Sequence, residues 1–101
     1  MLFAFIGRDR PQSAGVRRDI RPQHKNYLSQ ISGNIAFAGP LLSDNGEMLG
    51  SLLVIDFVDR EAAENWIARE PFTMAGLYSS MDVVAFENLW PQRTGFPPEP
   101  S

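Results

Sequence analysis

The sequence has no cysteine, a single histidine and no long hydrophobic run. The absence of cysteine excludes disulfide bonds and thiolate chemistry. One histidine without cysteine also makes a structural zinc site improbable, because such sites take four Cys or His ligands. The opening MLFAFIG has no basic region before it and is too short for a signal peptide or a transmembrane helix. We therefore expect a cytoplasmic protein.

Positive charge is scarce overall but concentrated near the N-terminus. The net charge is −3, which argues against a nucleic-acid surface. Residues 8–25 nevertheless hold six basic side chains against two acidic ones, a balance of +4, so the rest of the chain carries −7. The pattern alone favours a solvated loop and helix start. The alternative is a surface that attracts a small anionic substrate.

Short apolar runs rich in aromatic and branched residues predict four strands. They are residues 2–7, 34–42, 51–58 and 81–90. The second run contains Gly39-Pro40, and a proline cannot donate to a sheet ladder, so this strand should be an edge or carry a bulge. The Asn45-Gly46 pair predicts a hairpin loop after it.

Two helices are predicted between these strands. The first begins with Pro22, since the first helical position needs no N–H donor, and it places His24 in the first turn. A left-handed residue at positions 33–34 would end it. The second helix is capped by Asp59 and ends at Glu70, because the proline that follows disfavours helical geometry there.

The order strand, helix, strand, strand, helix, strand predicts a ferredoxin-like α+β domain over residues 1–90, an antiparallel sheet with both helices on one face. RNA-binding modules share this order, but the strand motif with paired aromatics and a basic residue is missing here. The proline-rich residues 91–101 should form an extended tail without regular structure.

In this topology the residues that interrupt the apolar patterns meet at one end of the domain. They are Asp9, His24, Gly39-Pro40, Ser51 and Glu70. Glu70 ends an otherwise apolar helix face, which fits either the rim of a pocket or an exposed, frayed helix end. Ser51 is interpreted as a polar lining group, and Tyr78 as a core residue or a second pocket hydroxyl.

His24 also admits two interpretations. A lone histidine on an apolar helix face is more often structural than catalytic. A carboxylate from Asp9 or Glu70 would instead hold the imidazole ready to take a proton near neutral pH. We expect such a partner within hydrogen-bond distance, with Asp9 preferred over Glu70.

The strings RPQHKNYL, AGPL and GSLLVIDFVDREAAENWIAREPFTMAGLY together resemble the YciI-like family. The resemblance runs from the first predicted strand to the last. It implies a ferredoxin-like subunit that pairs into a dimeric α+β barrel, with a site centred on a histidine and an acidic residue. His24 matches that histidine, Asp9 an aspartate typical after the first strand, and Arg21 and Gly39-Pro40 further motif positions.

One departure concerns Glu70-Pro71, where the family usually has Asp-Pro, so the carboxylate extends one methylene further. Relatives in the wider group include a dehydrochlorinase acting on chlorinated hydroxyquinols and muconolactone isomerase. The resemblance thus implies proton abstraction from a small cyclic, often anionic molecule, with no metal or organic cofactor.

Two hypotheses follow. In the first, the protein is a cofactor-independent isomerase or lyase in which His24 abstracts a proton, Asp9 fixes its tautomer, and arginines or backbone N–H groups stabilise the resulting anion. The residues expected to bind the substrate are Arg8, Arg21, Gly39, Pro40, Ser51 and Tyr78. In the second, the same dimeric barrel is a small-ligand-binding or interaction subunit without chemistry. A homodimer is expected in both.

Overall fold

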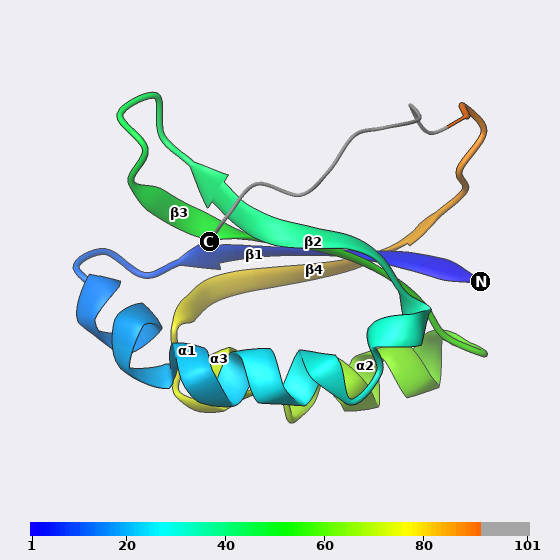
Figure 1. Cartoon of the computed structure of the whole chain (residues 1–101), viewed down its shortest axis with the longest axis horizontal. Coiled ribbons are helices and arrows are strands. Elements are labelled where there is room, and N and C mark those ends of the chain that lie inside the picture. The colour runs from blue at the N-terminus through cyan, green and yellow to red at the C-terminus, as the bar shows by residue number, and fades with distance from the viewer. Residues whose placement is uncertain (92–101) are drawn as a thin grey trace.

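The computed structural model describes residues 1–91, in which four antiparallel strands form one sheet with the helices on one of its faces (Figure 1). The strands are β1 (Leu2–Asp9), β2 (Ile35–Leu42), β3 (Met48–Asp56) and β4 (Tyr78–Phe86), in the order β2-β3-β1-β4. The helices are α1 (Ala14–Ser29), α2 (Arg60–Ala68) and α3 (Pro71–Met74), with a 3₁₀ turn η1 (Ser32–Asn34) before β2. The ferredoxin-like prediction is confirmed, and the strand bounds differ from it by a few residues.

The core lies between the sheet and the helices, because alternate strand residues point toward the helices. Phe3 and Phe5 of β1 are at most 1% exposed. They pack with Leu53 of β3 and with Ala63 and Ile67 of α2. Full burial of a large apolar side chain stabilises the fold by about 1.5–3 kcal/mol. The apolar face of α2 is therefore what fixes it to the sheet.

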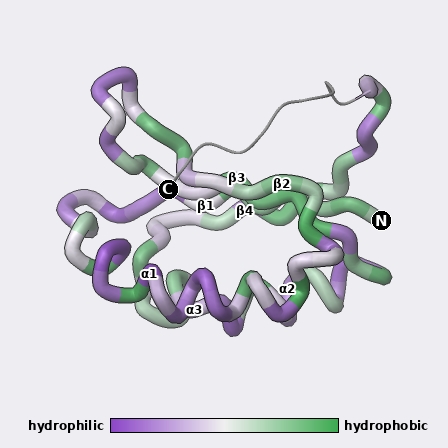
Figure 2. Tube along the Cα trace, viewed as in Figure 1, coloured by the Kyte–Doolittle hydropathy of each residue, from purple (hydrophilic) through white to green (hydrophobic). Residues whose placement is uncertain are grey.

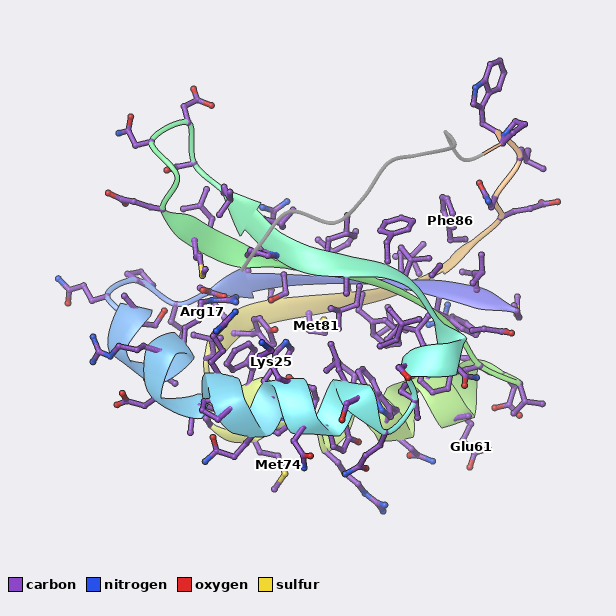
Figure 3. The ribbon with its side chains drawn as sticks, in the orientation of Figure 1. Arg17, Lys25, Glu61, Met74, Met81 and Phe86 are labelled. Carbon is purple, nitrogen blue, oxygen red and sulfur yellow. The ribbon has the colours of Figure 1, made fainter. Side chains whose placement is uncertain are left out.

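Within residues 1–91 no helix covers the opposite face of the sheet, and Figure 2 shows that the strands are rich in hydrophobic residues. Phe37, Val84 and Phe86 remain 49%, 49% and 41% exposed there. The strand register places Val84 opposite Ala4 on this face. Figure 3 shows Phe86 on this open side and Met81 between the sheet and the helices. We call this surface the open sheet face.

The first helix starts earlier than the sequence predicted. It begins at Ala14 after a turn in which Gln12 has a φ of 58° and the Ser13 hydroxyl donates to the Arg10 carbonyl. Pro22 lies inside the helix, where it removes one backbone hydrogen bond. His24 is therefore in the middle of α1, so the predicted position in the first turn is wrong.

The second helix ends before the proline, as expected, but a further short helix follows. α2 begins after Asp59, whose side chain accepts a hydrogen bond from the Ala62 N–H, which confirms the predicted cap. It ends at Ala68, and Glu70 is the N-cap residue of α3. The sequence did not predict α3. The predicted tail lies outside the described residues from position 92 on. No helix within residues 1–91 is both long and apolar enough to cross a membrane.

Candidate active site

A cavity of about 570 Å³ lies between α1, the sheet and α3. We call it the His24 cavity. Its charged and polar lining residues are Arg17, Arg21, His24, Lys25 and Ser51, and most of the rest of the wall is apolar or backbone from β2, β3 and the Phe72 ring. The cavity thus combines an apolar wall with a few convergent polar groups, as small-molecule sites do.

His24 pairs with Glu70 at the edge of this cavity. Nδ1 of His24 is in hydrogen-bond contact with Oε1 of Glu70. The histidine side chain is 15% exposed and the glutamate side chain is 0% exposed. The His24 ring also stacks on Phe72, with the ring centroids 4.0 Å apart and the planes 17° from parallel. Carboxylate and aromatic ring together fix the orientation of the imidazole.

The local sequence explains why a carboxylate is buried here. Pro71 starts α3, and Oε2 of Glu70 accepts hydrogen bonds from the N–H groups of Phe72 (3.1 Å) and Thr73 (3.3 Å). Glu70 therefore uses one oxygen to cap a helix and the other to hold His24. The extra methylene relative to Asp-Pro does not prevent contact with the histidine.

Asp9 has a different partner, so the preference for an Asp9–His24 pair is wrong. Its carboxylate accepts two hydrogen bonds from Arg17, at 2.8 Å from Nε and 2.9 Å from Nη2. Burial of the Arg17 guanidinium acts to lower its pKa, but the hydrogen bonds and charge of Asp9 outweigh this and raise it. Asp9 and Arg17 form a buried bidentate ion pair, and its Arg17 member lines the His24 cavity.

Arg17 also donates to Ser51, which joins the ion pair to a pair of hydroxyl groups. The distance from Arg17 Nη2 to Ser51 Oγ is 2.9 Å, and the Tyr78 hydroxyl is 2.9 Å from the same oxygen. Burial is the main cause that raises the pKa of Tyr78 to about 12. Tyr78 is therefore neutral at physiological pH.

Glycine at position 7 makes the contact between Tyr78 and Ser51 geometrically possible. Ser51 lies opposite Gly7 in the register of β1 and β3, and β1 separates β3 from β4. A Cβ atom at Gly7 would lie 2.7 Å from the Tyr78 ring. Since real Cβ atoms do not approach so closely, the tyrosine reaches across β1 only because residue 7 has no side chain.

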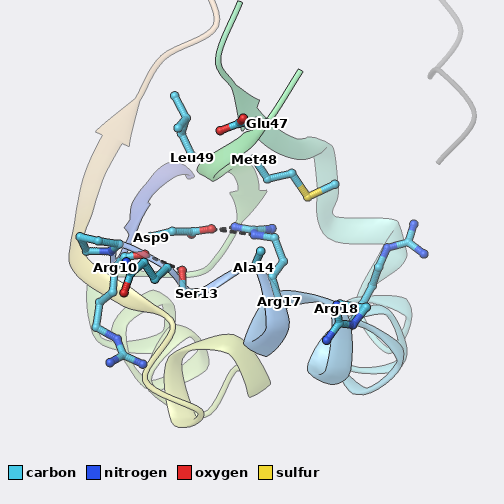
Figure 4. A pocket seen from close by; sticks show the side chains of 12 residues that line it. Asp9, Arg10, Ser13, Ala14, Arg17, Arg18, Glu47, Met48 and Leu49 are labelled. Carbon is cyan, nitrogen blue, oxygen red and sulfur yellow. Dashed lines mark hydrogen bonds and ion pairs between the residues drawn. The ribbon is translucent and has the colours of Figure 1, made fainter. Parts of the chain in front are cut away.

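A second cavity of about 780 Å³ adjoins the first (Figure 4). It lies between the segment after β1, the start of α1 and the β2–β3 hairpin. Arg17, Arg21 and Met48 line both cavities. Figure 4 shows the Asp9–Arg17 pair in its wall. Arg17 of this ion pair therefore borders both cavities.

The predicted site residues are not all at the His24 cavity. His24, Arg21, Gly39, Pro40 and Ser51 line it. Glu70 and Tyr78 do not line it, but Glu70 contacts His24 and Tyr78 is hydrogen-bonded to Ser51. Asp9 lines the adjoining cavity. Arg8 is exposed and lines neither cavity, because its β1 neighbours Gly7 and Asp9 point toward the helices.

Sequence reasoning missed Arg17, Lys25 and Phe72. Arg17, Arg21, His24 and Leu28 recur at i, i+4, i+7 and i+11, which is one helical face. That signal was hidden because the helix was expected to start at Pro22. Within residues 1–91 no group of three or more His, Cys, Asp or Glu side chains is placed to hold a metal ion.

Comparisons with known proteins agree with this architecture. The family model of the YCII-related domain matches residues 1–87. Protein YciI of Escherichia coli O6:H1 is 29% identical over 98 residues, which cover 89% of this chain and 100% of that protein. An uncharacterized protein of Haemophilus influenzae is 26% identical over the same length.

One similar protein of known structure carries an activity in its name. It is the 5-chloro-2-hydroxyhydroquinone dehydrochlorinase of Burkholderia phenoliruptrix AC1100, solved in complex with 2,5-dihydroxybenzoquinone. It is 32% identical and superposes with a TM-score of 0.81 over 86% of this chain and 94% of its own. The match to residues 1–87 and these relatives show that the chain belongs to the family of YCII-related domains.

Proposed function

We propose that the protein is a cofactor-independent isomerase or lyase that moves a proton on a small cyclic, anionic substrate. The observation that carries this proposal is the His24–Glu70 pair at the His24 cavity, with a wholly buried carboxylate. A base oriented by a second group is the arrangement that general acid–base catalysis requires.

In this proposal His24 is the base, and Glu70 orients its ring. We place a hydrogen on Nδ1 of His24, which donates it to Oε1 of Glu70, because the other oxygen of Glu70 already acts as an acceptor for two backbone N–H groups. Nε2 of the neutral ring then carries the lone pair and accepts the substrate proton. Glu70 offsets the positive charge that forms on the ring. In an isomerisation Nε2 returns the proton to another substrate atom. In an elimination a leaving group such as chloride departs, and the net loss is HCl.

Positive charge at the cavity supports an anionic substrate. Arg21 and Lys25 line it, and within residues 1–91 neither forms an ion pair. The charge of Arg17, in contrast, is matched by Asp9. Arg21 and Lys25 would attract an anion and stabilise the negative charge that proton removal creates.

The similar dehydrochlorinase supports a ring-shaped substrate. Its name gives 5-chloro-2-hydroxyhydroquinone as the compound it acts on, and its structure holds 2,5-dihydroxybenzoquinone. A cavity of about 570 Å³ is large enough for a single substituted ring. We propose substrates of this size and charge for the present protein.

We also propose that the protein acts as a homodimer. The open sheet face exposes large apolar side chains across β2 and β4, among them Phe37, Val84 and Phe86. Such a surface is unusual for a monomer. Pairing two open sheet faces would bury on the order of 1,000 Å² or more, the area expected of a stable interface.

The catalytic proposal is tested by chloride release from 5-chloro-2-hydroxyhydroquinone, followed together with isomerisation of small lactones. The wild-type protein should turn over at least one of these compounds. His24→Asn should lower the rate by roughly 10²–10⁴-fold. Gln23→Asn, a change at the exposed neighbouring residue, should leave the rate unchanged.

Two results would reject catalysis by His24. One is a His24→Asn variant that turns over as fast as the wild type. The other is a wild-type protein that binds these compounds without converting any of them, which would identify a ligand-binding subunit instead.

A further inference from the structure

We propose that the Ser51 hydroxyl donates its hydrogen into the His24 cavity and binds an oxygen atom of the substrate, either a carbonyl oxygen or a phenolate. This inference rests on the proposed function, because it names the chemical group that the same site recognises.

Ser51 Oγ accepts two hydrogen bonds, and neither of them uses its own hydrogen. A hydroxyl group has two acceptor positions and one donor hydrogen. Both acceptor positions of Ser51 Oγ are filled, by Arg17 Nη2 and by the Tyr78 hydroxyl, each at 2.9 Å. The hydrogen has no acceptor within the part of the chain that the structure describes. Ser51 is 3% exposed, so bulk water does not solvate it freely.

The direction of the two hydrogen bonds follows from the donors. A guanidinium group can only donate, so Arg17 takes one acceptor position in every arrangement. Burial raises the pKa of Tyr78 to about 12, so the phenol keeps its hydrogen and has one to donate. If the Ser51–Tyr78 bond were reversed, the hydrogen of Tyr78 would be left over instead. Ser51 lines the cavity and Tyr78 lines neither cavity, so Ser51 is the group that can offer a hydrogen to a ligand.

The surrounding residues hold the Ser51 oxygen in place. Arg17 is fixed by its bidentate contact with Asp9. Tyr78 reaches Ser51 over Gly7 and packs edge-on against Phe72, with ring centroids 6.3 Å apart. A donor that is already oriented before the substrate binds does not have to reorganise as charge develops. Ser51 thus has the properties of a preorganised donor.

The chemistry of the cavity indicates which oxygen it would bind. The hydroxyl is a donor toward the cavity, so the ligand atom must be an acceptor. The Arg17 guanidinium on the same oxygen, together with Arg21 and Lys25 in the wall, favours an acceptor that carries or gains negative charge. A ring carbonyl that becomes an enolate, or a phenolate, satisfies both conditions.

The test compares two variants that break the same hydrogen bond. Ser51→Ala and Tyr78→Phe both remove the Ser51–Tyr78 contact, but only Ser51→Ala removes the hydrogen that points into the cavity. The probe is 2,5-dihydroxybenzoquinone, and its dissociation constant is measured by isothermal titration calorimetry. Ser51→Ala should weaken binding by about 10- to 100-fold, as expected for a lost hydrogen bond to a charged group. Tyr78→Phe should weaken it by a smaller factor, under about threefold.

A crystal structure of the wild-type protein with the probe is the second measurement, and it does not depend on how the variants fold. It should place a probe oxygen about 2.5–3.0 Å from Ser51 Oγ. Equal losses in the two variants, undiminished binding by Ser51→Ala, or a wild-type protein that does not bind the probe would each overturn the proposal.

The same experiment separates this inference from the proposed catalysis. His24→Asn should lose turnover, whereas the comparison of Ser51→Ala with Tyr78→Phe measures binding of the probe and does not depend on turnover. If the wild-type protein shows no turnover but the Ser51 and Tyr78 variants differ as expected, the catalytic proposal fails and the donor role of Ser51 stands.

Discussion

Nδ1 of His24 contacts one carboxylate oxygen of Glu70, whose side chain is completely buried. Glu70 is held by the first backbone N–H groups of α3, and His24 by stacking on Phe72. Neither side chain of the pair is therefore free to turn away. The pair is positioned by a four-residue helix that exists because Pro71 follows the glutamate.

The buried ion pair of Asp9 and Arg17 gives the first prediction. The two side chains are 8% and 9% exposed, so Asp9→Asn leaves a buried guanidinium charge without its counterion. We expect Asp9→Asn to lower the free energy of unfolding by about 3–5 kcal/mol, measured by urea denaturation. The double variant Asp9→Asn/Arg17→Met should recover much of the loss, because the unpaired charge is gone. A single variant as stable as the wild type would contradict the buried pair.

The space above Gly7 gives a second prediction. A methyl group at residue 7 would lie 2.7 Å from both the Tyr78 ring and the Met81 methyl group, and the Tyr78 ring also packs edge-on against Phe72. We expect Gly7→Ala to lower the free energy of unfolding by about 1–3 kcal/mol. Gly33→Ala is the matched control, because nothing lies within 4 Å of its added Cβ, and it should change stability by less than about 0.5 kcal/mol. Equal effects of the two variants would show that the tyrosine does not cross β1 as described.

The ionisation of Tyr78 gives a prediction for alkaline pH. Burial raises its pKa from 10.0 to about 12 in the folded protein. Between these values the unfolded chain loses the phenol proton and the folded chain keeps it, so stability falls as pH rises from 10.0 to about 12. We expect wild-type stability to decline more steeply than that of Tyr78→Phe in urea denaturation at a series of pH values. Parallel curves would mean that Tyr78 titrates as an exposed phenol.

The open sheet face gives a prediction about assembly. Val84 is 49% exposed on β4, an edge strand of this face, and a charge there would have to be buried on pairing. We expect the wild type to sediment as a dimer at micromolar concentration and Val84→Glu to sediment as a monomer of 11.3 kDa. Val58→Glu, in a loop where the valine is 85% exposed, should remain dimeric. A wild-type protein that sediments as a monomer would contradict the proposed homodimer.

The sequence was sufficient for the topology because each strand is a short apolar run rich in aromatic and branched residues, and both predicted helices carry an apolar face. That topology alone brought Glu70 and His24 to the same region. The predicted start of α1 was wrong for two reasons. Residues 13–20 (SAGVRRDI) contain few apolar residues, and Pro22 is a good first residue for a helix.

The hydrogen-bond partners within the site could not be predicted from the spacing of apolar and charged residues in the sequence. Arg17 belongs to a segment whose charge suggests solvation, yet it is 7% exposed and pairs with Asp9. Asp9 was therefore unavailable to His24. Glu70 is held beside the histidine as the N-cap residue of α3, and this helix is too short for its periodicity to be detected in the sequence.

The tautomer of His24 decides whether its Nε2 can act as the base, and it can be measured without overlap because the sequence contains one histidine. Nitrogen-15 NMR of untagged protein resolves a single pair of ring nitrogens. In the neutral ring we expect a protonated Nδ1 that donates to Glu70 and an Nε2 without hydrogen, and Glu70→Gln should disturb this preference. A neutral ring protonated at Nε2, or one unaffected by Glu70→Gln, would contradict the assignment of His24 as the base.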